Sequence, residues 1–212
     1  MDEQKTGVIS RLLRSPAPPA TPEEYFAHLP TLATPRLILR RLTMRDAADV
    51  YEYARDREVA RQVLWEAHAS VWESKAFLRF IIRQYRTGQP ASWGIVLKET
   101  GRVIGTIGFM SWNADNSTME LGYSLARAHW NQGLMTEALT AVLRQTFDVL
   151  KINRAEAMHF TDNPASGRVM AKCGMQYEGR LRQRIRCRGA FRDVDMWAML
   201  RSDWKKRTAR KP

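Results

Sequence analysis

The sequence has little cysteine, no long apolar run and no cluster of metal-binding residues. Two cysteines, Cys173 and Cys187, occur in 212 residues, too few for a disulfide-built scaffold. No window approaches the ~20 apolar residues that span a bilayer, and no signal-peptide pattern is present. No spacing of metal ligands and no Ser-His-Asp order is seen. We therefore expect a cytoplasmic protein with reduced thiols and no metal.

Acidic residues are scarce, with 22 Asp and Glu against 34 Lys and Arg, so the formal net charge is +12. Arginines alternate at 182, 184, 186 and 188, and residues 205–212 are basic. Two interpretations stay open. The cations either form a solvated strand face and a frayed terminus, or they attract a polyanion such as ribosomal RNA, an acidic protein segment or cofactor phosphates.

Length and a hydrophobic content of 44% suit one folded domain. The run at residues 15–22 concentrates proline and small residues, which is a linker composition. We predict an N-terminal extension, a domain and a basic tail, at residues 1–33, 34–204 and 205–212. Within the extension, Tyr25, Phe26 and Leu29 are the candidates for docking on the domain.

Strand and helix patterns alternate along the domain. Strands are predicted at 37–42, 92–97, 102–109, 117–125, 154–160, 181–188 and 193–200. Helices are predicted at 46–54, at 72–85 with Phe77, Phe80 and Ile81 inward, at 135–150 and at 165–173. Short turns within 92–125 indicate an antiparallel meander. The expected fold class is α/β (α+β), a mixed, largely antiparallel twisted sheet with helices on both faces.

The chain is organised around a polar turn at 130–133 that runs into an amphipathic helix, with apolar residues at intervals of three and four over 135–150. A strand precedes the turn. Backbone N–H groups in such a loop, together with the positive end of the helix dipole, can hold a phosphate. The alternative is a glycine turn that only caps the helix.

Several motifs agree in spacing and order with one family. These are Glu-Leu-Gly-Tyr at 120–123, the loop at 130–138, Asn-Pro-Ala-Ser at 163–166 and Lys-Cys-Gly-Met at 172–175. Together they resemble the GNAT acetyltransferases, and within these the RimJ/RimL type, which acetylates protein N-termini. The resemblance extends from Thr34 to Trp204. It implies a GNAT-like fold and acetyl-CoA as cosubstrate.

The resemblance also implies where the cofactor binds. The backbone of residues 123–125 would pair with the pantetheine arm, and the loop would hold the pyrophosphate. The implied cofactor residues are Tyr123, Ser124, Leu125, Asn131, Gln132, Gly133, Leu134, Met135, Thr136, Asn163 and Arg168. The family's loop runs Gln/Arg-x-x-Gly-x-Gly/Ala, so Trp130 and Met135 depart from it, and Met135 must point away from the pyrophosphate. Asn163 also reads as a turn residue, and Arg168 as a surface arginine.

Glu120 and Ser166 are the candidate catalytic residues. An α-amino group with a pKa of about 7.7–8.0 is mostly protonated at neutral pH, so a nearby base, here Glu120 through a water, is useful. A solvent-facing strand glutamate is the alternative. Many GNAT enzymes protonate the thiolate with a tyrosine where this chain has Met170, and Ser166 matches the serine acid of the RimJ/RimL type. A helix-cap serine is the competing interpretation, and His159 reads as structural.

The leading hypothesis is an acetyl-CoA-dependent N-acetyltransferase that acts by direct transfer on a protein N-terminal α-amine. By resemblance, the acceptor pocket would involve Trp65, His68, Trp72 and the arginines at 182–188. An acceptor that is a small-molecule amine stays open. So does a non-catalytic ribosome- or RNA-binding module, which explains the charge but leaves Glu120 and Ser166 unused. Ribosome association and a homodimer are further partner hypotheses.

Overall fold

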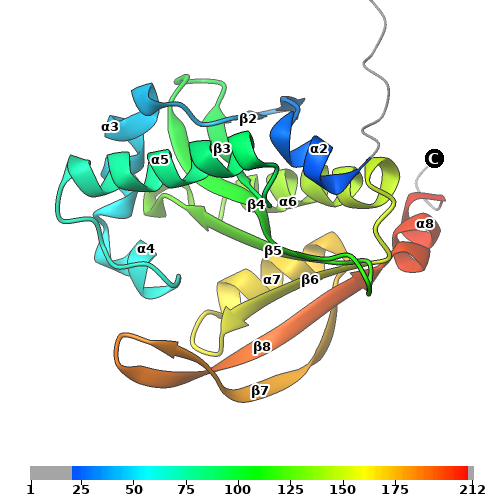
Figure 1. The fold of residues 1–212 in the computed structure, drawn as a ribbon. Helices are drawn as coiled ribbons and strands as arrows, with labels where there is room; N and C mark the ends of the chain where they lie inside the picture. The colour runs from blue at the N-terminus through cyan, green and yellow to red at the C-terminus, as the bar shows by residue number, and fades with distance from the viewer. Residues whose placement is uncertain (1–20, 210–212) are drawn as a thin grey trace, which may run out of the picture.

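The computed structural model describes residues 21–209, which form one eight-stranded sheet with helices on both faces (Figure 1). The strands lie in the order β1-β2-β3-β4-β5-β6-β8-β7. Their bounds are β1 Leu32–Ala33, β2 Leu37–Arg40, β3 Ser92–Leu97, β4 Val103–Asn113, β5 Thr118–Leu125, β6 Arg154–Phe160, β7 Gln176–Cys187 and β8 Ala190–Leu200. Only β5 and β6 pair in parallel. The predicted fold class and the meander β3-β4-β5 are confirmed.

The α-helices of the described residues are α2 Pro22–Ala27, α3 Ala47–Ala54, α4 Arg57–Arg61, α5 Val71–Thr87, α6 Leu134–Arg144, α7 Pro164–Cys173 and α8 Arg201–Ala209. A π-helical turn, Gln145–Val149, extends α6. Adjacent residues of β5 show which helices cover which face. Tyr123 hydrogen-bonds to Ser166 of α7, whereas Ser124 hydrogen-bonds to Tyr53 of α3. Strand alternation therefore places α3 and α7 on opposite faces of the sheet.

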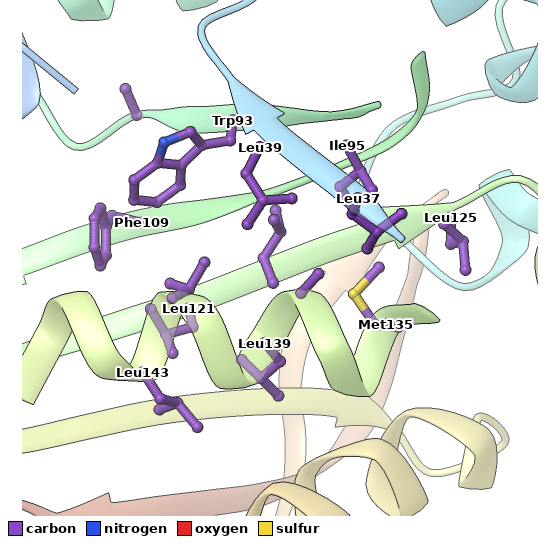
Figure 2. Packing of buried hydrophobic residues seen from close by; sticks show 14 of the residues in the cluster. Leu37, Leu39, Trp93, Ile95, Phe109, Leu121, Leu125, Met135, Leu139 and Leu143 are labelled. Carbon is purple, nitrogen blue, oxygen red and sulfur yellow. The ribbon is translucent and has the colours of Figure 1, made fainter. Parts of the chain in front are cut away.

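The predicted apolar stripe of α6 packs against the sheet, and Figure 2 shows apolar side chains between this helix and strands β2 to β5. The stripe residues buried in this core are Met135, Ala138, Leu139, Val142, Leu143 and Phe147. On α5, the predicted inward residues Phe77 and Ile81 do pack against the core, together with Leu78 and Tyr85. Phe80 is 58% exposed, so the inward orientation predicted for Phe80 was wrong. No helix within residues 21–209 has the length and apolar character needed to cross a bilayer.

The predicted boundary between extension and domain is corrected by the packing of residues 21–33. Helix α2 buries Tyr25 and Phe26, and β1 pairs with β2 at the edge of the sheet. The ring of Phe26 lies 5.3 Å from that of Phe109, measured between centroids. The folded domain therefore includes residues 21–33, and residues 1–20 lie outside the described part. At the other end, α8 carries the expected basic tail as a helix as far as Ala209.

Truncating Phe26 tests this correction. Phe26 is 0% exposed, so Phe26→Ala removes a fully buried ring and should lower the free energy of unfolding by about 3–5 kcal/mol. Urea unfolding followed by circular dichroism measures the change. Phe80→Ala is the matched control, because that ring is mostly exposed, and it should cost well under 1 kcal/mol. Equal stability of the two variants would restore the extension boundary at residue 33.

Candidate functional site

The parallel strands β5 and β6 separate along their length and leave a gap in the sheet. They pair only from Thr118 to Leu121 and from Arg154 to Ala157. Each strand continues beyond that point on its other side, β5 along β4 as far as Leu125 and β6 along β8 as far as Phe160. A cavity of about 410 Å³ lies at this gap.

The cavity reaches both faces of the sheet. On one face its walls are the first turns of α6 and α7, and on the other they are Val59, Gln62 and Val63, at the end of α4. Met158 and His159 of β6 also line it, and their side chains alternate between the two faces. Two molecules can therefore approach one point in the gap from opposite sides.

Two residues of the turn before α6 have left-handed backbone conformations. Asn131 and Gly133 have φ values of +59° and +77°, in the left-handed region that asparagine tolerates and glycine adopts freely. Met135 is buried and points into the core near Leu37, away from the loop surface (Figure 2). The hydrophobic core therefore accommodates Met135, which stands where the family's loop has glycine or alanine.

Glu137, in the first turn of α6, holds this loop to the segment before β2. Its Oε1 accepts hydrogen bonds from Thr34 Oγ1 at 2.6 Å and from the Arg36 backbone N–H at 2.8 Å. Arg36 Nε donates to Glu137 Oε2 at 2.8 Å, and Arg36 Nη1 donates to Gln132 O at 2.9 Å. Burial opposes ionisation of Glu137, but these hydrogen bonds outweigh it and lower its pKa. The loop backbone is thus fixed before any ligand binds.

The backbone of β5 presents polar groups to the gap. Ser124 O points toward β4, since a Cβ built on Gly105 would lie 2.3 Å from it. Peptide groups alternate in direction along a strand, so the N–H and C=O of Tyr123 and Leu125 face the gap. Trp130 Nε1 donates to Leu125 O at 2.7 Å and joins the strand end to the loop.

Two side chains from different walls of the cavity contact each other, Tyr123 of β5 and Ser166 of α7. Asn163 is the N-cap of α7, and its Oδ1 accepts a hydrogen bond from Ser166 N at 3.2 Å. The competing interpretation of Ser166 as the cap is therefore wrong. Instead, Ser166 Oγ lies 2.7 Å from the phenol oxygen of Tyr123. Burial raises the pKa of Tyr123 well above its ordinary value.

Arg168 and Lys172 lie one turn apart on α7, and both line the cavity. Both are exposed, and neither forms an ion pair with another residue of the range 21–209. His159 has a different role, because Trp197 Nε1 donates to its Nε2 at 3.1 Å and its Nδ1 lies 2.8 Å from Phe160 O. With both ring nitrogens occupied by the protein, His159 is structural.

Most of the predicted site residues come together at the cavity. Those that line it are Tyr123, Ser124, Leu125, Asn131, Gly133, Leu134, Met135, Thr136, Asn163, Ser166 and Arg168. Gln132 is not among them, and its amide donates to Ala128 O instead. Glu120 also lies outside the lining, where it accepts a hydrogen bond from Ser111 Oγ at 3.1 Å. It is two residues, or about 7 Å of strand, from Gly122 at the gap.

The acceptor residues expected from resemblance do not line the cavity. Trp65 and His68 pack against each other, and Trp72 is mostly exposed. The turn after α4 lines that wall instead, and Arg188 at the β7-β8 turn holds it. Arg188 Nη2 donates to the carbonyl oxygens of Ala60, Val63 and Trp65. Because α4 has five residues, its sequence carries too short a pattern to be recognised.

The chain is similar to known proteins in both sequence and fold. Residues 36–176 match the model of the acetyltransferase (GNAT) domain. The uncharacterized N-acetyltransferase YoaA of Bacillus subtilis is 33% identical over 172 residues, covering 81% of this chain and 97% of that protein. The [ribosomal protein uS5]-alanine N-acetyltransferase of Escherichia coli is 28% identical over 82% of this chain and 92% of its own. A RimL structure in complex with coenzyme A superposes with a TM-score of 0.72 at 20% identity, covering 81% and 98%.

The Glu137 contacts predict a pH-dependent effect of Glu137→Gln. Hydrogen bonds to the carboxylate lower the pKa of Glu137 in the folded state, so its stabilisation is present above the ordinary carboxyl pKa and is lost as pH falls through the lowered value. The variant should be less stable than wild type by about 1–2 kcal/mol at pH 7, and the difference should shrink below about pH 4. Urea unfolding from pH 7 to pH 3 measures it, with Glu99→Gln as the exposed control. A difference that is constant with pH would contradict the ionised contact.

Proposed function

Because the chain belongs to the GNAT acetyltransferase family, whose cosubstrate is acetyl-CoA, we propose that it acetylates the N-terminal α-amine of a protein. The observation that carries the proposal is the cavity at the β5-β6 gap, which opens to both faces of the sheet. The acceptor class is supported by the similarity to the uS5-alanine acetyltransferase. Family membership also favours an enzyme over a non-catalytic RNA-binding module.

We propose that acetyl-CoA enters from the face of α6 and α7. The gap-facing peptide groups of Tyr123 would pair with the pantetheine amides, and the loop at 131–136 would bind the pyrophosphate at the N-terminus of α6. Arg168 and Lys172 would supply positive charge to the cofactor phosphates. This arrangement leaves the α4 face of the gap to the amine.

In the proposed reaction, the amine nitrogen attacks the thioester carbonyl carbon and forms the C–N bond. Glu120 takes the excess proton of the amine through a bridging water, because its carboxylate lies about two strand residues from the gap. The C–S bond then breaks, and the sulfur keeps the electron pair. Ser166 supplies the proton that yields free coenzyme A, and serine regains a proton from water. Transfer is direct, without a covalent enzyme intermediate.

A panel of acceptors tests the substrate class. The protein is incubated with acetyl-CoA and with short peptides that begin with Ala, Ser or Met, each also in an N-terminally blocked form, and with spermidine. We expect acetylation of free N-terminal peptides, with the modified nitrogen located by tandem mass spectrometry. Acetylation of spermidine alone would establish the small-molecule alternative and remove the protein acceptor.

The substitution Glu120→Gln tests the base. It keeps the size and hydrogen bonding of the side chain but removes its ability to accept a proton. Turnover at pH 7 should fall by ~10²–10⁴ and recover partly as pH rises, since the amine then deprotonates unaided. Glu156→Gln on the adjacent strand is the matched control, because Glu156 pairs with Glu120 across β5 and β6 but is bound by Arg154. Unchanged turnover of Glu120→Gln at pH 7 would remove Glu120 from the mechanism.

A further inference from the structure

The contact between Tyr123 and Ser166 joins the two walls of the cavity. Tyr123 is on β5 and Ser166 is in the first turn of α7, 43 positions later in the chain. The phenol oxygen lies 2.7 Å from Ser166 Oγ and 3.2 Å from Ser166 O. Both residues line the cavity, so the contact lies beside the space that the thioester would occupy.

We propose that Tyr123 is a positioning residue whose phenol donates a hydrogen bond to Ser166 Oγ and so directs the serine proton toward the departing thiolate. A hydroxyl group has one proton and two acceptor lone pairs, and its proton rotates to suit its neighbours. When the phenol occupies one lone pair, the serine proton no longer points at Tyr123. It is then free to point into the cavity. The inference rests on the proposed role of Ser166 as the acid.

The phenol proton has two acceptors on Ser166, the carbonyl oxygen at 3.2 Å and Oγ at 2.7 Å, and the proposal assigns it to the nearer one. A phenol is more acidic than an aliphatic alcohol and is therefore the better donor of the pair. Burial raises the pKa of Tyr123, so the phenol keeps its proton throughout the working pH range. The backbone of Ser166 is held by Asn163, which leaves the serine hydroxyl proton as the part that needs orienting.

Two other residues that line the cavity cannot take the place of Tyr123. Met170 carries no proton to donate, and His159 already has partners on both ring nitrogens. During the reaction Tyr123 loses no proton and forms no covalent bond. Its contribution is the orientation of Ser166, and it disappears if Ser166 has no hydroxyl group.

A double-mutant cycle measures this dependence. Wild type, Tyr123→Phe, Ser166→Ala and the double variant are assayed with acetyl-CoA and a peptide that begins with alanine. We expect Tyr123→Phe to lower kcat about tenfold or more, with the KM for acetyl-CoA unchanged. We expect Ser166→Ala to lower kcat further, and the double variant to equal Ser166→Ala, because the phenol then has nothing to orient. If the enzyme accepts spermidine and not the peptide, the same cycle is run on spermidine, because the inference concerns the leaving thiolate and not the acceptor.

Tyr25→Phe is the matched control. It also removes a buried phenol with a side-chain partner, Gln145 Oε1 at 2.9 Å, but it lies outside the cavity and should leave kcat unchanged. Equal loss from Tyr123→Phe with and without Ser166 would overturn the inference, as would unchanged kcat in Tyr123→Phe. Full activity of Ser166→Ala would overturn the acid and this inference together. A wild-type protein that is stabilised by acetyl-CoA but acetylates no acceptor would instead reject the proposed function, and the inference with it.

Discussion

The site depends on one constraint, the short parallel pairing of β5 and β6. A parallel pair requires a crossover, and here α6 supplies it, so α6 begins where β5 ends. Helix α7 follows the end of β6 in the same way. Both helices therefore begin at the same end of the sheet, where the strands separate after Leu121. The positive ends of two helix dipoles and the unpaired edge of β5 thus meet in one place without any charged residue being needed.

The features that neighbouring residues determine could be predicted from the sequence. The features that depend on contacts between distant segments could not. The apolar stripe of α6 is a periodic pattern, so it was predicted correctly. The separation of β5 from β6 depends on where pairing ends between segments about 35 residues apart, and no local pattern encodes that. Tyr25, Phe26 and Leu29 were correctly named as docking candidates, but the proline-rich run before them suggested a linker, so their place in the core of the domain was not predicted. The distance of Glu120 from the cavity could not be predicted either, because alternation gives the face of a strand and not the position of a cavity along it.

Some of the arginines that make the chain basic stabilise the fold. Arg180 pairs with Asp195, Arg192 pairs with Asp162, and Arg188 binds carbonyl oxygens after α4. Arg188 and Arg192 join the last hairpin to the rest of the domain, whereas Arg180 joins the two strands of the hairpin to each other. Within residues 21–209, Arg182, Arg184 and Arg186 are exposed and form no ion pair, so they are the part of the hairpin whose charge faces solvent. The choice between a solvated face and a polyanion-binding face therefore concerns these three arginines.

The Arg188 contact has a mechanical consequence for the cavity. A displacement of the β7-β8 turn is transmitted to the turn after α4, because one guanidinium group holds three carbonyl oxygens there. Arg188 and Gly189 both have positive φ values, so this turn has few other backbone conformations in which to keep that contact. On the opposite side, Arg168 and Lys172 are exposed and unrestrained by ion pairs within the described chain. Widening the cavity on the α4 side therefore requires the β7-β8 turn and the turn after α4 to move together, whereas the side chains of Arg168 and Lys172 can move without the backbone.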